Sequence, residues 1–260
     1  MKMFRRIFCL LWLACASLGV SAQVDNYALD FTDYSGVANL GKVEELADAR
    51  AYTLQFWFNP AEWTQGAALV RCGTFSIKLG VEHALVINDG TNHFALTVSE
   101  LAAGKWAHLT LRTDAQGTVA TINNAHTFSC PQPVAFPADE KSIWLGGGFK
   151  GRIDEVRVWQ GTLSEAYSSF WQNTLNDLIP SWDALLAYWK LDQEQCAHIV
   201  DYRGTHHGTL SPEGVKKAKV VYNDRFRYRI NLAYGDIARF FDRKIDARHY
   251  SLSNRISVIG

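Results

Sequence analysis

Short segments in which apolar and polar residues alternate recur along this chain, and they constrain its fold more than any other feature. In residues 53–59, Leu54, Phe56 and Phe58 point one way, whereas Gln55 and Trp57 point the other. This alternation is typical of β-strands with one buried face. Similar runs, separated by turns rich in Gly, Asn and Asp, cover residues 67–71, 75–79, 84–87, 93–98, 107–111 and 118–122. We therefore expect an all-β, two-sheet antiparallel sandwich rather than a parallel α/β fold.

One short helix is expected after these strands. Residues 162–165 fit a capping box, in which Thr162 covers open N–H groups and Glu165 reaches back. The helix would run to about Leu175, because Pro180 blocks its continuation.

The first residues have the composition of a secretory signal. A basic start precedes the apolar residues 7–20 and the small pair Ser21-Ala22. We expect residues 1–22 to be a signal peptide that is cleaved before Gln23. The apolar stretch is shorter than the roughly 20 residues that a membrane span needs, and the residues before Cys15 fit a lipid-anchor motif poorly. Since no later stretch is apolar enough to span a membrane, we expect a secreted, periplasmic or cell-surface protein.

Charge is distributed unevenly along the chain. Residues 216–260 carry eleven Lys and Arg against four Asp and Glu, whereas residues 23–215 carry twelve against twenty-two. Phe226, Tyr228 and Ile230 alternate with arginines, which predicts a half-exposed strand in a basic C-terminal β extension. A basic segment can bind nucleic acid. In an exported protein we expect it instead to dock on the acidic body or to form a solvated strand face, and we expect no nucleic-acid partner.

Three cysteines follow the expected cleavage site: Cys72, Cys130 and Cys196. Export permits disulfides, and an odd number leaves at least one thiol free or intermolecular. Cys72 with Cys130 is the first candidate pair, because both lie in the strand-rich block.

Several segments occur in the same order along the chain as in a known family. They are the opening strand at 27–31, an aromatic-rich strand ending at a proline at 52–60, a hairpin at 104–111 and 117–123, and a glycine turn with a closing strand at 145–148 and 151–159. Together they resemble the LamG-like, concanavalin A-like lectin-glucanase family of bacterial secreted or surface proteins. The resemblance implies a jelly roll over residues 23–221, with its core in 23–165, a helix and a returning strand in 166–221, and the basic extension at 222–260.

One departure from the family concerns the order of segments. Residues 187–192 and the turn at 206–208 resemble the family's first strand and the turn after it, yet they follow the closing strand. Either they begin a curtailed second repeat, or they supply the missing first strand of the main sandwich.

No catalytic motif is evident. Glycoside hydrolases need two carboxylates on one strand face, roughly 5–9 Å apart, and the neighbours Asp154 and Glu155 are expected on opposite faces. The sequence has no serine nucleophile elbow, zinc motif or phosphate loop. His206 and His207 lie in a turn and lack an evident third metal ligand.

Asp154 is the most informative acid. It shares a strand face with Val156 and Val158, so we expect it to face the core. A buried carboxylate must be hydrogen-bonded, paired or metal-bound, which leaves two alternatives: capping of loop N–H groups, or a structural Ca²⁺ site. The family resemblance implies calcium near this strand, with Asp33 as the second ligand.

Three tryptophans are candidate ligand-binding residues. Trp57 and Trp159 lie on faces opposite the expected core, and Trp63 lies in a loop. An exposed aromatic plane suits a sugar ring or a protein partner, unless the helix and the tail cover it. We expect an exported, non-catalytic module that binds carbohydrate or a surface or extracellular protein. The alternatives are an assembly domain of a larger surface protein, and a glycoside hydrolase or lyase with an unrecognised site.

Overall fold

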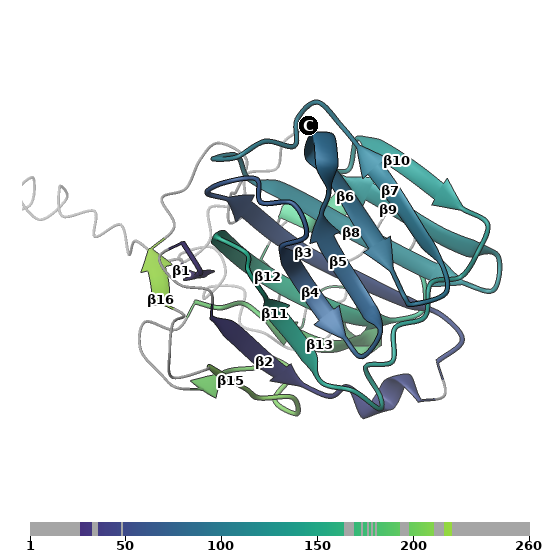
Figure 1. The fold of residues 1–260 in the computed structure, drawn as a ribbon. Helices are drawn as coiled ribbons and strands as arrows, with labels where there is room; N and C mark the ends of the chain where they lie inside the picture. The colour runs from purple at the N-terminus through teal and green to yellow at the C-terminus, as the bar shows by residue number, and fades with distance from the viewer. Residues whose placement is uncertain are drawn as a thin grey trace, which may run out of the picture.

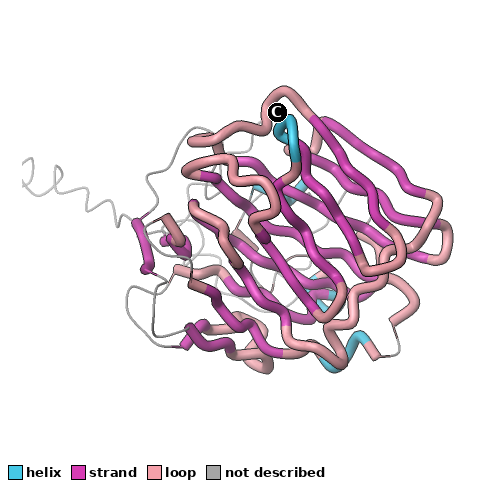
Figure 2. Tube along the Cα trace, in the orientation of Figure 1, coloured by secondary structure: helices cyan, strands magenta, loops and turns pink. Residues whose placement is uncertain are grey.

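The computed structural model describes residues 27–32, 36–47, 49–163, 169–172, 174–175, 177, 179, 181–192, 198–210 and 216–219. These residues form two stacked antiparallel β-sheets, which confirms the predicted sandwich (Figure 1, Figure 2). The helical elements among them are short 3-10 turns: η1 (Glu44–Leu46), η2 (Val81–His83), η3 (Ser169–Gln172) and η4 (Trp182–Ala184). Across this part of the chain, no helix is long and apolar enough to cross a membrane.

Sheet A has the strand order β10-β9-β8-β3-β12-β1-β16, with β13 also paired to β12. Its strands are β1 (Tyr27–Asp30), β3 (Tyr52–Pro60), β8 (Ala107–Asp114), β9 (Gly117–Ile122), β10 (His126–Cys130), β12 (Gly151–Gln160), β13 (Leu185–Trp189) and β16 (Lys216–Lys219).

Sheet B has the order β14-β15-β2-β11-β4-β5-β6-β7. Its strands are β2 (Val37–Gly41), β4 (Ala68–Cys72), β5 (Phe75–Leu79), β6 (Ala84–Asn88), β7 (His93–Thr97), β11 (Ile143–Gly146), β14 (His198–Ile199) and β15 (Gly208–Leu210).

The main core lies between the two sheets, where the predicted alternation places it. Leu54, Phe56 and Phe58 of β3 are fully buried and pack with Ile77 and Ile87 of sheet B in one hydrophobic cluster. Successive side chains on a strand point to opposite faces. The residues between them therefore form the outer face of each sheet.

The returning segment completes the main sandwich instead of beginning a separate repeat. One edge of β12 pairs with β3. The opposite edge is shared, because β1 pairs with it at Ile153 and β13 pairs with it from Val156 to Trp159. The N–H of Tyr27 donates to Asp192 Oδ1 at 3.3 Å, so the start of β1 meets the chain that follows β13. Strand β15 of the same segment pairs with β2 in sheet B.

Several predicted segments lie wholly or partly outside the described residues. Of the helix expected over 162–175, residues 169–172 form the 3-10 helix η3, whereas the proposed capping residue Glu165 is not described. The signal peptide at 1–22 and the basic extension at 222–260 also lie outside the described residues, so the domain limits stay predictions.

The predicted Cys72–Cys130 disulfide is wrong, because both cysteines are free in the structure. Cys72 ends β4 in sheet B, whereas Cys130 ends β10 in sheet A, so their strands belong to different layers. The Cys72 thiol donates to the carbonyl of Lys141 at 3.4 Å, and the Cys130 thiol donates to Gln132 Oε1 at 3.1 Å.

Candidate functional site

The outer face of sheet A, where two of the predicted ligand-binding tryptophans lie, is covered. Trp57 is only 1% exposed and Trp159 only 2%. The ring of Trp171 in η3 stacks on Trp57 with a centroid separation of 5.1 Å, and its carbonyl accepts the Trp57 indole N–H at 3.2 Å. Neither tryptophan can therefore offer a stacking plane to a ligand.

A second apolar cluster closes the same face around Trp159. It contains Trp159, Leu163, Leu175, Leu185 and Tyr188, with Ile179, Trp182 and Ala184 packed against it. The chain that follows β12 therefore crosses the outer face of sheet A. Of the two alternatives for Trp57 and Trp159, the structure supports coverage by the chain itself.

Asp154 lies on this covered outer face, and the expectation that it faces the core is wrong. A β-bulge interrupts the β12–β3 register between Asp154 and Arg157, and Glu155 has a φ of 52°. A bulge adds one residue to a strand and shifts the alternation beyond it. Ile153 therefore joins Val156 and Val158 in the main core, while Asp154 is the cross-strand partner of Trp57.

Burial gives Asp154 unusual electrostatics. Burial raises the pKa of its carboxyl well above the usual range, and the charges of Glu155 and Asp192 raise it further. The backbone N–H of Glu155 donates to Asp154 Oδ1 at 2.9 Å. Burial therefore favours the protonated form of the Asp154 carboxyl in the folded protein.

The free energy of unfolding of the wild type is expected to fall as pH rises, because of Asp154, and replacement of Asp154 by asparagine is expected to make this fall smaller. The folded protein keeps the Asp154 proton to a higher pH than the unfolded chain, which releases it above the ordinary pKa of 3.8. Wild-type stability from this group is therefore present below that pH and declines as pH rises toward the folded pKa. Asparagine keeps an acceptor for the Glu155 N–H but does not titrate. Urea unfolding of both proteins from pH 3.8 upward would test this. If the free energy of unfolding changes equally with pH in the wild type and in the variant, the pKa of Asp154 is not raised.

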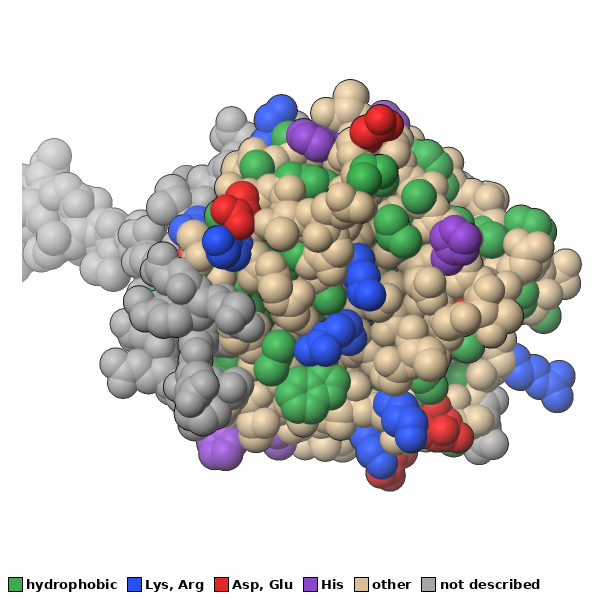
Figure 3. Space-filling view, viewed as in Figure 1, with side chains coloured by type: hydrophobic (Ala, Val, Ile, Leu, Met, Phe, Trp, Pro, Cys, Tyr) green, Lys and Arg blue, Asp and Glu red, His purple; other side chains and the backbone are tan. Residues whose placement is uncertain are grey.

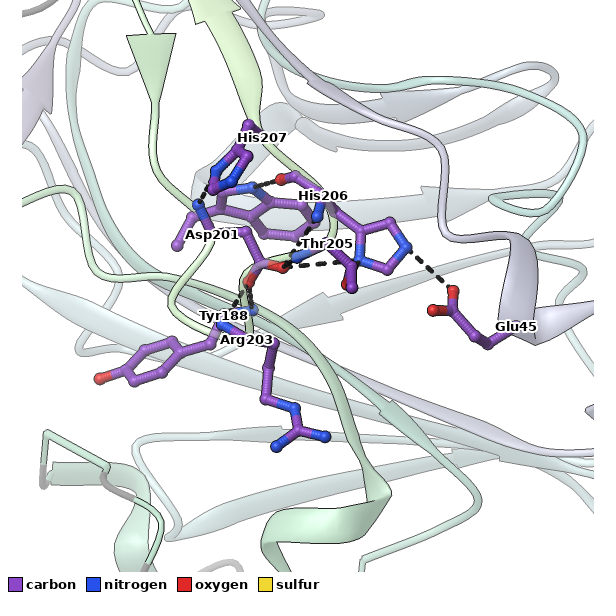
Figure 4. Close-up of polar contacts among 8 residues, drawn as sticks. Glu45, Tyr188, Asp201, Arg203, Thr205, His206 and His207 are labelled. Atoms are coloured by element: carbon purple, nitrogen blue, oxygen red, sulfur yellow. Dashed lines mark hydrogen bonds and ion pairs between the residues drawn. The ribbon is translucent and has the colours of Figure 1, made fainter.

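Figure 4 shows a second polar cluster, in the loop at residues 201–207. Asp201 accepts the backbone N–H groups of Tyr188, Arg203, Thr205 and His206 at 2.8–3.1 Å. These bonds set the shape of the turn that the sequence predicted around His206 and His207.

His206 links this loop to the start of η1. Its Nε2 lies 2.9 Å from Glu45 Oε2, and its Nδ1 lies 3.5 Å from Asp201 Oδ2. The hydrogen bond with Asp201 raises the pKa of His206, burial opposes this, and the charge of Glu45 adds to the rise. The imidazole ring of His206, held between two carboxylates, ties the loop to η1.

An open polar cleft of about 820 Å³ lies beside this tie, lined by Gly41, Lys42, Glu44, Glu45, Ser142, Thr205, His206 and His207. Its lining has charged and hydroxyl groups but no aromatic residue other than the two histidines. The cleft can hydrogen-bond a polar ligand but gives a sugar ring no large plane on which to stack.

The outer face of sheet B combines an aromatic plane with polar neighbours. Ile143 and Leu145 are buried in the core, so Trp144 between them points outward and is only half-buried. Cross-strand pairing places Trp144 between Asn39 of β2 and Arg71 of β4. The same register continues to both edges of the sheet and defines what we call the Trp144 row: His198, Thr209, Asn39, Trp144, Arg71, Ser76, Asn88 and His93.

Sequence reasoning missed Trp144, although a signal was present. The residue stands between two apolar residues, which predicts that it points outward. The flanking Asn39 and Arg71 are distant in the sequence, so only the strand order of sheet B reveals them as neighbours.

Comparison with known proteins agrees with this architecture. Residues 32–167 match the sequence profile of the family described as the concanavalin A-like lectin/glucanases superfamily. The chain belongs to this superfamily. No curated protein matches the sequence.

Solved structures similar to this chain have low sequence identity to it. A candidate carbohydrate-binding protein from Bacteroides ovatus has a TM-score of 0.59 at 19% identity, over 76% of this chain and 61% of that protein. This chain thus spans less than two thirds of that relative. Domain 4 of AbnA, an extracellular arabinanase from Geobacillus stearothermophilus, has a TM-score of 0.44 at 22% identity, over 55% and 75% of the two chains. A pentraxin from Limulus polyphemus has 0.47 at 13%, over 76% and 96%.

The superfamily includes glucanases, but the acids on the outer face of this member's sheet A do not form an accessible catalytic pair. Asp154 is 2% exposed and Glu155 is fully buried. Glu155 Oε2 lies 2.5 Å from Arg157 Nη2 and also accepts the hydroxyl of Tyr188. A glycosidase needs two carboxyl groups that flank its substrate, and no substrate can reach these two.

The described residues do not group three acidic, histidine or cysteine side chains around one point. Calcium binds about six to eight oxygen ligands, and in the described part of this superfamily member no three His, Cys, Asp or Glu side chains are grouped to hold a metal ion. The proposed partner Asp33 lies outside that part. Structural Ca²⁺ at Asp33 and Asp154 therefore stays a prediction.

Of the three tryptophans predicted to bind a ligand, Trp63 is half-buried, whereas Trp57 and Trp159 are buried. Its indole N–H donates to the Gly80 carbonyl at 2.8 Å, and the His83 ring stacks on it with a centroid separation of 5.0 Å. The histidine covers one ring face, which leaves Trp63 a poorer stacking plane than its place in a loop predicted.

Proposed function

We propose that this protein is an exported, non-catalytic module that binds carbohydrate on the outer face of sheet B. The observation that carries the proposal is Trp144, a half-buried indole flanked in register by Asn39 and Arg71. A sugar ring has an apolar C–H face and a rim of hydroxyl groups, so it needs an aromatic plane with hydrogen-bonding groups beside it.

Both neighbours of Trp144 are held in place by the backbone. Asn39 Oδ1 accepts the N–H of Gly41 at 2.9 Å, which leaves the side-chain amide N–H groups as donors. Arg71 Nε donates to the carbonyl of Gly146 at 3.2 Å. Such fixed side chains lose little conformational entropy when a ligand binds. The description of the B. ovatus protein as a candidate carbohydrate-binding protein is consistent with the proposal.

Burial of the carboxyl groups on β12 supports a module that does not cleave its ligand. The only adjacent carboxylates on β12, Asp154 and Glu155, are sealed under the second apolar cluster, and Glu155 is paired with Arg157. In contrast, the Trp144 row has no carboxyl group that could act as a general acid. A face of this kind can bind a sugar chain without cleaving it.

The test is binding of the full chain to a panel of polysaccharides, measured by affinity electrophoresis and calorimetry. Trp144→Ala is expected to weaken binding at least about tenfold, because buried aromatic anchors dominate binding energies and about 1.4 kcal/mol corresponds to tenfold. Trp63→Ala removes another half-buried tryptophan and is expected to leave affinity unchanged. Thermal melts of both variants would verify the fold.

Two outcomes would contradict the proposal. Loss of binding in Trp63→Ala but not in Trp144→Ala would move the site to the loop. Failure of the wild-type chain to bind any polysaccharide would favour a protein partner or an assembly role, and glycan cleavage during the assay would show an enzyme.

A further inference from the structure

The outer face of sheet B is basic, although the body of the protein is acidic. Its outward strand positions are all described residues: Val37, Asn39, Ala68, Arg71, Ser76, Lys78, Ala84, Val86, Asn88, His93, Ala95, Thr97, Trp144, His198 and Thr209. None of them is Asp or Glu, whereas residues 23–215 as a whole carry twenty-two acids against twelve Lys and Arg. Figure 3 views the molecule from this side and shows basic side chains over the middle of the face and side chains of both charges toward its periphery.

The face has two strong cations, Arg71 and Lys78, and the first is a direct neighbour of the aromatic plane. Arg71 is the cross-strand neighbour of Trp144, and Ser76 pairs with Arg71 on its other side. Lys78 lies on the same face of β5 as Ser76 and is exposed. Within the part of the chain that the structure describes, neither Arg71 nor Lys78 forms an ion pair. No carboxylate among the described residues therefore neutralises their charges.

The guanidinium of Arg71 suits an anionic group on a sugar. Its Nε is engaged by Gly146, and the planar guanidinium of arginine can donate parallel hydrogen bonds to a carboxylate or a sulfate. A sugar stacked on Trp144 could direct such a group toward Arg71 across one strand spacing of about 4.8 Å.

The shape of the face indicates an extended ligand. The Trp144 row crosses eight strands, which corresponds to a length of roughly 34 Å at the usual spacing between strands. An outward-facing row of this length fits several sugars of a chain better than it fits a single sugar in a pocket.

We propose that the outer face of sheet B binds an extended anionic polysaccharide, with Trp144 stacked on a sugar ring and Arg71 and Lys78 paired with its carboxylate or sulfate groups. The inference rests on the proposed carbohydrate-binding function and adds the charge of the ligand. A neutral polysaccharide would leave both cations unused.

The experiment compares polymers that differ only in charge. The full chain is titrated with polygalacturonate and its methyl ester, and with dextran sulfate and dextran, which separates carboxylate from sulfate recognition. The wild type is expected to bind at least one charged polymer at least tenfold more tightly than its neutral counterpart, with an affinity that falls as salt is added. Arg71→Gln and Lys78→Gln are each expected to weaken this binding about two- to fivefold.

Two controls separate specific recognition from general attraction between opposite charges. Lys105→Gln removes the same charge from an exposed loop before β8 and is expected to leave the affinity unchanged. Polyglutamate provides negative charge without sugar rings, so Trp144→Ala is expected to reduce binding of the charged polysaccharide while leaving any binding of polyglutamate unchanged.

The remaining outcomes are distinguishable. Equal affinity for charged and neutral polymers, still dependent on Trp144, would overturn the anionic inference but keep the proposed function. Equal losses in Arg71→Gln and Lys105→Gln, or binding of polyglutamate as tight as that of the polysaccharide, would also overturn it. No binding of any polysaccharide by the wild type would remove the proposed function and the inference together.

Discussion

Replacement of Arg157 by methionine is expected to lower the free energy of unfolding by about 3–5 kcal/mol, the usual cost of leaving a buried charge without its partner. The side chains of Arg157 and Glu155 are only 1% and 0% exposed, and their nitrogen and oxygen lie 2.5 Å apart. Without Arg157, the Glu155 carboxylate keeps the Tyr188 hydroxyl as a donor but loses its paired cation in an interior from which water is excluded. Urea unfolding followed by tryptophan fluorescence would measure the loss.

The double variant Glu155→Gln with Arg157→Met is the internal control. Removing both charges is expected to cost less than removing Arg157 alone, because no buried carboxylate then lacks a partner. Lys150→Met breaks the exposed pair with Glu62 and is expected to have no measurable effect. If Arg157→Met has the same free energy of unfolding as the wild type, Arg157 does not stabilise a buried negative charge on Glu155.

Replacement of Asp201 by alanine is expected to lower the free energy of unfolding by about 3 kcal/mol. Its carboxylate accepts four backbone N–H groups at 2.8–3.1 Å, including that of Tyr188 in the buried strand β13. A buried donor that loses its acceptor pays the full cost of leaving water. The variant is also expected to free His206 from one of its two carboxylates.

The pH dependence of this effect is opposite in sign to that of Asp154. Burial alone would raise the pKa of Asp201, but hydrogen bonds from the His206 side chain and from backbone N–H groups outweigh burial and lower it. The stability from Asp201 is therefore present above the ordinary pKa of 3.8 and is lost as pH falls through the lower folded value. The wild type and Asp201→Ala should converge in stability in acid.

Asp183→Ala is the matched control, because Asp183 is an exposed acid of η4 in the same part of the chain. It is expected to change stability little. Equal stability of Asp201→Ala and the wild type at neutral pH would show that water replaces the carboxylate in the loop, and would contradict the assigned role.

The sequence by itself determined most of the strands and the inward face of regular strands such as β3. The alternation of Leu54, Phe56 and Phe58 is a local pattern with the period of a strand, so it identifies the buried face before any partner strand is known. The order of the resembling segments identified the superfamily that the comparisons confirmed. The turn at His206 and His207 was also readable, because its residues are close in the sequence.

Only the tertiary structure decided which outer face is open. Trp57 and Trp144 carry the same local signal, an aromatic residue between inward-facing apolar residues, yet Trp171 covers the first and Asn39 and Arg71 flank the second. The bulge at Glu155 moved Asp154 to the other face, because one residue with a positive φ shifts the alternation of β12. Burial of an outer face and the composition of a cross-strand row depend on segments far apart in the chain, and a local period contains no information about them.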